Sequence, residues 1–257
     1  MSMDYSAHLE AARQAALHAG EYLREQFHAV KLVDEALQHD IKLRLDKEVQ
    51  QMITERLLKA FPQSAILGEE GNEGDAAAEL LWVVDPIDGT VNYFYGIPIF
   101  CVSIALLHCG KWVLGCVYDP MQQECFEAVA GGQATLNGEP VAVSGRSSMC
   151  EAVVFVGHGT HDGSGDAGVR RFAHISRQVR KMRILGSAAL SLCYIAAGRL
   201  DAYVEDRISL WDFAAARVIL EAAGGVLEFS PHTEDGIKGS VIAWNGTLPL
   251  HAALQMN

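Results

Sequence analysis

Residues 82–90 read Trp82-Val83-Val84-Asp85-Pro86-Ile87-Asp88-Gly89-Thr90, an apolar run that ends in two closely spaced carboxylates. The apolar residues 80–84 predict a buried strand that carries Asp85 at its end, and Pro86 predicts a turn there. Asp88 follows three residues later, and two such carboxylates repel unless a cation lies between them or one takes a proton. Hard oxygen ligands of this kind favour Mg²⁺, Mn²⁺ or Ca²⁺. A solvated turn explains the same residues, so the stretch leaves both interpretations open.

The charge balance bears on the class of ligand. The 257 residues carry 20 Lys and Arg against 32 Asp and Glu, a net charge of −12 with neutral His. This balance excludes a general nucleic-acid binder and disfavours adhesion to anionic membranes. Gly89 permits an unusual backbone angle, and Thr90 predicts the start of a short helix, whose free N–H groups can hold an anion. Cations and backbone amides therefore offer an acidic chain a way to accept phosphate.

Two further acidic positions gain meaning only beside this stretch. Glu69-Glu70 follows a strand-like segment, 16 residues before Asp85. Adjacent residues at a strand end point to opposite faces, so at most one of the pair needs to face a cation. Asp212 lies at the start of an apolar helical pattern, where Asp is a common N-cap. Each position has an ordinary structural explanation by itself.

The hydrophobic pattern predicts a mixed α/β or α+β layered fold rather than a simple doubly wound sheet. Cys109-Gly110-Lys111 predicts the turn of a hairpin, and the Gly-rich stretch 157–168 predicts a boundary between halves at about 1–156 and 157–257. Helices are expected at about 5–27, 46–61, 168–180, 188–197 and 212–223, and strands at 65–67, 80–84, 99–107, 112–118, 152–156, 182–185, 200–205, 226–229 and 240–244.

In combination, Glu69-Glu70, residues 85–90 and Trp211-Asp212 resemble the inositol monophosphatase family of Mg²⁺-dependent phosphomonoesterases. The segments 185–189 and 198–203 are also similar to family segments, so the resemblance covers nearly the whole chain. It implies one domain, residues 1–257, with the layered α-β-α-β-α sandwich of the inositol monophosphatase and fructose-1,6-bisphosphatase type. It further implies inhibition by lithium and a homodimer.

The resemblance also implies a metal centre of two or three Mg²⁺ ions, for which Mn²⁺ can substitute. The first ion would be bound by Glu69, Asp85 and the main-chain carbonyl of Ile87. The second would be bound by Asp85, Asp88 and Asp212, and a third would contact Glu69 mainly through waters. A metal lowers the pKa of bound water and neutralises phosphoryl charge, so we expect direct attack by water.

Catalytic and substrate-binding roles follow from the same resemblance. Thr90, with Asp46 behind it, would orient the attacking water together with Glu69, and Glu70 would support this network. The family positions that contact substrate correspond to Asp88, Gly89, Thr90, Gly186, Ser187, Ala188 and Glu205. One departure is that Leu43 and Leu45 precede Asp46, where family members often carry Thr or Ser.

These observations favour hydrolysis of a polyol phosphate, first of all inositol monophosphate. Fructose-1,6-bisphosphate, histidinol phosphate and nucleotide 3′-phosphates are alternative substrates within the family. A non-catalytic regulatory binding protein and a Zn²⁺ hydrolase built on His158 and His161 are alternatives from other classes. Three interpretations of the basic stretch 170–183 are open: a solvated face, a site for a second phosphate, or part of a dimer surface.

Six scattered cysteines and the lack of a secretory or membrane-spanning run predict a cytoplasmic protein without membrane or nucleic-acid partners.

Overall fold

The computed structural model describes residues 4–36, 41–75, 78–157 and 165–255. Its larger sheet has eight strands in the order β10-β9-β8-β7-β6-β5-β3-β4. The pairs from β5 to β8 are antiparallel, and β3 pairs with β5 in parallel. The strands are β3 (Ala65–Gly68), β4 (Gly71–Glu73), β5 (Leu80–Asp88), β6 (Cys101–His108), β7 (Lys111–Asp119), β8 (Glu124–Val129), β9 (Thr135–Leu136) and β10 (Glu139–Pro140).

A second sheet has five strands in the order β12-β11-β13-β15-β14. Strand β11 lies parallel to both β12 and β13, whereas β15 pairs antiparallel with β13 and β14. Its strands are β11 (Val153–Val156), β12 (Lys181–Arg183), β13 (Ala202–Ser209), β14 (Val226–Pro231) and β15 (Lys238–Trp244). A small antiparallel pair, β1 (Val33–Ala36) and β2 (Ile41–Leu43), precedes the second helix.

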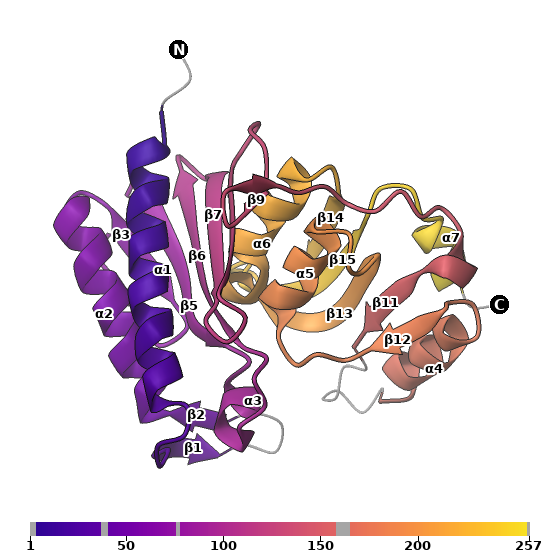
Figure 1. Cartoon of the computed structure of the whole chain (residues 1–257), viewed down its shortest axis with the longest axis horizontal. Helices are drawn as coiled ribbons and strands as arrows, with labels where there is room; N and C mark the ends of the chain where they lie inside the picture. Colours follow the sequence, from indigo (N-terminus) through magenta and orange to yellow (C-terminus); the bar gives the residue numbers. More distant parts are fainter. Residues whose placement is uncertain (1–3, 37–40, 76–77, 158–164, 256–257) are drawn as a thin grey trace.

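Helices alternate with the two sheets in five layers, which confirms the layered α-β-α-β-α architecture (Figure 1). Helices α1 and α2 cover the outer face of the large sheet, α5 and α6 fill the space between the sheets, and α4 and α7 cover the outer face of the small sheet. The helices are α1 (Ser6–Gln26), α2 (Arg44–Ala60), α3 (Thr90–Tyr95), α4 (Gly165–Ser176), α5 (Ala188–Ala196), α6 (Leu210–Ala222) and α7 (Leu250–Leu254).

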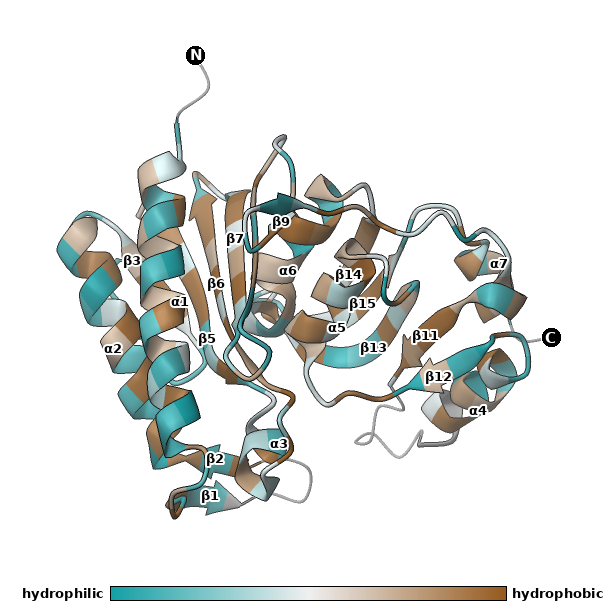
Figure 2. Ribbon diagram, viewed as in Figure 1, coloured by the Kyte–Doolittle hydropathy of each residue, from teal (hydrophilic) through white to brown (hydrophobic). Residues whose placement is uncertain are grey.

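The strand period of two explains why the large sheet is covered on both faces. Trp82 and Val84 are buried under α1 and α2, whereas Val83 is buried in the core that contains α5 and α6. The central strands are accordingly apolar on both sides, as the continuous hydrophobic colouring of β5 to β7 shows (Figure 2). Among the described residues, no helix combines the length and apolarity needed to cross a bilayer.

Small residues set the spacing of the middle layer. A Cβ atom added to Gly115 of β7 would collide with the backbone of Ala215 in α6, so the helix lies directly on the strand. Residues 214–216 are all buried, because α6 has sheet on both sides. This close packing fixes the start of α6, and therefore Asp212, relative to β5 and β6.

The turn predicted at Pro86 is wrong, because β5 continues to Asp88 through an irregularity in the ladder. Asp85 pairs with Ser103 and Asp88 pairs with Cys101, so three steps on β5 match two steps on β6. Residues three apart in a regular strand point to opposite faces, whereas the extra residue turns both carboxylates to the same face. Pro86, which has no N–H to give the ladder, lies within this bulge.

Candidate active site

Asp85 lies at the centre of a group of four carboxylates. It is buried, and its pKa is raised well above the usual range by that burial and then by the negative charges of Glu69, Asp88 and Asp212. One of its oxygens accepts the Ile87 N–H at 3.0 Å, which holds the side chain across the bulge. A set of hard, mutually repelling oxygen donors suits a divalent cation.

Asp88 is anchored to the start of α5. The Ser187 hydroxyl donates to Oδ2 at 2.5 Å, and the backbone N–H groups of Ala188 and Ala189 donate at 3.1 and 2.7 Å. Burial raises the pKa of Asp88, and these hydrogen bonds oppose the rise. Helix α5 therefore favours the carboxylate form of Asp88.

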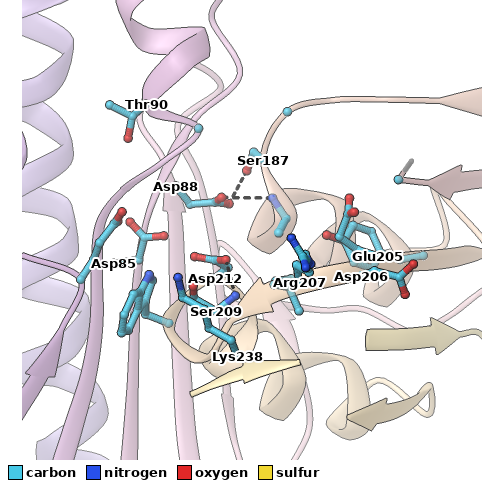
Figure 3. A pocket seen from close by; sticks show the side chains of 18 of the residues that line it. Asp85, Asp88, Thr90, Ser187, Glu205, Asp206, Arg207, Ser209, Asp212 and Lys238 are labelled. Carbon is cyan, nitrogen blue, oxygen red and sulfur yellow. Dashed lines mark hydrogen bonds between the residues drawn. The ribbon is translucent and has the colours of Figure 1, made fainter. Parts of the chain in front are cut away.

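Asp212 does not occupy the N-cap position that its place in the sequence suggested. Ser209 is the N-cap of α6, and Asp212 is the third helical residue, whose Oδ2 accepts the Ser209 N–H at 2.8 Å. This capping box fixes the first turn of α6. It also turns the Asp212 carboxylate toward Asp85 and Asp88 (Figure 3).

The two adjacent glutamates face different cavities, although they form the two-residue turn between β3 and β4 and do not continue the strand. Glu69 lines the cavity that holds Asp85, Asp88 and Asp212. Glu70 lines a separate cavity beside α2, where Lys42 Nζ lies 3.2 Å from its Oε1. Glu70, which was expected to support a water network, therefore lies outside the main cavity.

The predicted phosphate-binding residues follow the bulge directly. Gly89 has φ +100° and is the N-cap of α3. The Thr90 hydroxyl donates at 2.8 Å to the carbonyl of Ile87, which is the predicted main-chain metal ligand. A carbonyl oxygen has two lone pairs, so it can accept this bond and still face a cation.

The cavity next to these acids is about 970 Å³ and extends to the predicted substrate-side residues. Gly186, Ser187 and Ala188 line it at the start of α5, where Ser187 is the N-cap. Glu205 lines the opposite side on β13, and burial, followed by the nearby charge of Asp206, raises its pKa to about 7. Gly157 packs directly against the Glu205 carboxylate.

Several lining residues were missed in the sequence. Asp206, Arg207, His232 and Lys238 all border the cavity, and Figure 3 shows Arg207 between Asp212 and the Glu205–Asp206 pair. Arg207 has φ +63° within an irregularity of β13, a strained backbone for a residue with a side chain. Its position between Glu205 and Trp211-Asp212 is the signal that would have marked it.

The remaining predicted residues lie elsewhere. Asp46 is buried at the start of α2, where its Oδ2 accepts the Leu43 N–H at 2.6 Å, and it does not line the cavity. His158 and His161 fall outside the described residues. In the basic stretch, Arg171 Nη2 lies 2.7 Å from Asp206 Oδ2, so this stretch supports the substrate side of the cavity indirectly.

Comparison with known proteins is consistent across the chain. The model of the inositol monophosphatase family matches residues 4–255. A Pseudomonas aeruginosa protein, Nus factor SuhB, is 38% identical over 92% of this chain and 91% of its own, and a Rhizobium meliloti inositol-1-monophosphatase is 37% identical over 95% and 93%. The crystal structure of the extragenic suppressor protein suhB from Bartonella henselae superposes with a TM-score of 0.91, at 32% identity over 98% of this chain and 100% of that chain.

Proposed function

Since the chain belongs to the inositol monophosphatase family and is therefore a phosphoric monoester hydrolase, we propose that it hydrolyses a polyol phosphate, first of all inositol monophosphate, in a Mg²⁺-dependent reaction. The observation that carries this proposal is the convergence of Glu69, Asp88 and Asp212 on the buried Asp85. Four carboxylates this close require a cation or a proton. A phosphate ester brought to the same place requires a cation as well.

The donor set fits Mg²⁺, with Mn²⁺ as a substitute. We assign Glu69, Asp85 and the Ile87 carbonyl to one ion, and Asp85, Asp88 and Asp212 to a second. A third ion would use Glu69. When bound, the cations supply hydroxide near neutral pH and neutralise charge on the phosphoryl oxygens.

Within this proposal the protein positions the reactants and supplies no covalent nucleophile. The Thr90 hydroxyl donates a hydrogen bond to the Ile87 carbonyl, so its oxygen is free to accept a hydrogen bond from the attacking water. The Cys101 thiol contacts Asp88 Oδ2 at 3.5 Å, but burial raises its pKa well above the usual range, so it stays protonated and unreactive. Asp46 and Glu70 would act on this water through intervening groups.

The substrate side suits a hydroxyl-rich alcohol. Gly186, Ser187 and Ala188 have small side chains, which let a ring approach the backbone, and Glu205 can bond hydroxyl groups. Arg207 and Lys238 add positive charge to the same cavity. Because the Arg207 and Lys238 side chains can bind further anionic or polar groups, fructose-1,6-bisphosphate, histidinol phosphate and nucleotide 3′-phosphates are alternative substrates.

The test is phosphate release from inositol monophosphate, with Mg²⁺ and with Zn²⁺ alone. We expect Mg²⁺-dependent release that Li⁺ inhibits, and its loss in Asp85→Asn while the circular dichroism spectrum stays unchanged. The matched control is Glu221→Gln, an exposed carboxylate at the end of α6 that should retain full activity. Retained activity in Asp85→Asn would overturn the metal assignment, and activity with Zn²⁺ alone would favour a hydrolase that uses His158 and His161.

A second candidate function is a regulatory binding role, which the similarity to Nus factor SuhB favours. No phosphate release from a broad panel of monoesters would support it.

We further propose that residues 1–257 form one domain in two halves, that the protein is a homodimer and that it is cytoplasmic. The six cysteines are unpaired, which supports a reducing compartment.

A further inference from the structure

Two buried thiols and a carboxylate meet on the large sheet beneath α1, away from the proposed active site. Cys116 lies on β7, and Cys125 and Glu127 lie on β8. Their Sγ atoms and a Glu127 oxygen all lie within 4.8 Å of one another, and the two sulfurs are 3.8 Å apart. All three residues are at most 5% exposed.

We propose that Cys116, Cys125 and Glu127 supply three of the four ligands of a thiophilic divalent cation, Zn²⁺, at a site independent of the phosphatase centre, with a water as the fourth ligand. Two sulfurs about 2.3 Å from a tetrahedral Zn²⁺ are separated by about 3.8 Å, which equals the separation found here. Thiolate ligands select Zn²⁺ over the Mg²⁺ expected at the carboxylate centre.

The carboxylate supports the assignment. Glu127 Oε1 is buried and has no hydrogen-bond partner, an arrangement that costs stability unless another group satisfies it. The other oxygen, Oε2, lies 3.7 Å from Arg13 Nη1 of α1. Two thiolates and one carboxylate carry three negative charges, of which Zn²⁺ balances two, and Arg13, which also pairs with Glu10, lies beside the third.

The strand register disfavours a disulfide as the alternative. Cys116 pairs directly with Glu127, and Cys125 pairs with Tyr118, so the two cysteines are diagonal neighbours. Diagonal Cα atoms are about 7–8 Å apart, whereas a disulfide requires less than about 7 Å. A metal ion bridges the sulfurs without moving the strands.

Arg13 gives the ion a way in. Its side chain is 41% exposed, whereas that of Glu127, 3.7 Å away, is 6% exposed. Displacement of this side chain would open the site, and binding would release the two thiol protons to solvent as the Zn–S bonds form. The site would tie β7 to β8 beneath α1.

The experiment titrates the full chain with Co²⁺, a spectroscopic substitute for Zn²⁺, in excess Mg²⁺. We expect one equivalent to produce a thiolate-to-cobalt charge-transfer band that Zn²⁺ displaces. Cys116→Ser and Cys125→Ser should abolish the band, and Glu127→Gln should weaken binding about tenfold or more. Absence of the band in the folded wild-type protein would overturn the proposal.

The matched control is Cys109→Ser. Cys109 is an exposed thiol that lies near Glu79 and His108, so it is a competing source of a cobalt band. The band should persist in this variant. Its loss would place the cobalt site at Glu79, His108 and Cys109 and would overturn the proposal. Because core variants can unfold, a crystal of the wild-type protein soaked in Zn²⁺ gives an independent answer. Anomalous density between the three side chains supports the site, and density elsewhere or a Cys116–Cys125 disulfide overturns it.

Discussion

The Asp88 carboxylate, at the end of β5, accepts a hydrogen bond of 2.5 Å from the Ser187 hydroxyl, at the start of α5 and 99 residues later in the chain. The same carboxylate accepts the N–H groups of Ala188 and Ala189. One proposed metal ligand therefore also caps a helix of the middle layer. The position of Asp88 depends on α5 as much as on its own strand.

This relationship predicts a coupled loss of stability and activity in Ser187→Ala. Removing the N-cap should lower the free energy of unfolding by about 1–2 kcal/mol. It should also lower kcat and weaken Mg²⁺ binding, because Asp88 loses the hydroxyl that orients it. Chemical denaturation and the Mg²⁺ dependence of phosphate release measure the two effects.

Ser191→Ala is the control for this variant. Ser191 is buried in the same helix, and its hydroxyl donates to the Ser187 carbonyl at 2.6 Å without touching Asp88. The control should lose about 1 kcal/mol at most and keep its Mg²⁺ dependence. Equal effects of the two variants on Mg²⁺ binding would show that helix stability alone matters.

Gly89→Ala should reduce both stability and activity severely. Gly89 has φ +100°, and an added Cβ would lie 2.9 Å from the Ile99 carbonyl oxygen. Left-handed strain and the clash together should cost about 2–5 kcal/mol. Gly96, at the other end of α3, has φ +74° but open space around its Cβ.

Gly96→Ala should therefore cost about 1 kcal/mol and leave phosphate release nearly intact. Thermal unfolding and kinetics of both variants separate steric crowding at the site from backbone strain. Similar losses of activity in the two variants would refute the importance of the space around Gly89.

Much of the fold was predictable because its helices and central strands have strong periodicity. The hairpin turn at Cys109-Gly110-Lys111 was confirmed, with β6 ending at His108 and β7 starting at Lys111. Strand β8 was missed, because its sequence includes two glutamates, of which Glu127 is buried. A buried acid interrupts the apolar pattern on which a strand prediction depends.

The site was predictable in its residue types but not in its geometry. The bulge in β5 depends on pairing with β6, and no local pattern shows that Asp85 and Asp88 share a face. Glu69 and Glu70 do face different cavities, as predicted, but they do so from the turn between β3 and β4 and not from a strand end. Arg207 and Lys238 reach the cavity only because β13 and β15 are paired, which is a tertiary relationship.

Glu205 predicts a specific dependence of stability on pH. Burial raises its pKa from 4.5 to about 7, so the folded protein holds this proton at pH values where the unfolded chain has lost it. The contribution of Glu205 to stability is therefore complete below pH 4.5 and falls by up to about 1.4 kcal/mol per pH unit as pH rises to about 7. Glu205→Gln should remove this contribution.

Urea denaturation between pH 5 and 8 measures the difference between Glu205→Gln and the wild-type protein. Glu25→Gln, at an exposed position of α1, is the control and should keep the wild-type slope. An unchanged slope in Glu205→Gln would show that Glu205 titrates near its ordinary value.

Arg207→Gly should change the choice of substrate. The side chain lines the cavity, and its φ of +63° is a conformation that glycine adopts without strain, so the substitution suits the backbone. Loss of a cation from the cavity should lower kcat/KM for fructose-1,6-bisphosphate about tenfold relative to inositol monophosphate, because the second phosphate loses a charge-assisted hydrogen bond. Steady-state kinetics on both substrates measure the ratio.

Arg217→Gln is the control: it removes a cation of α6 that does not line the cavity, and it should leave the ratio unchanged. An equal decline on both substrates in Arg207→Gly would mean that Arg207 supports the site generally and does not select a second anionic group.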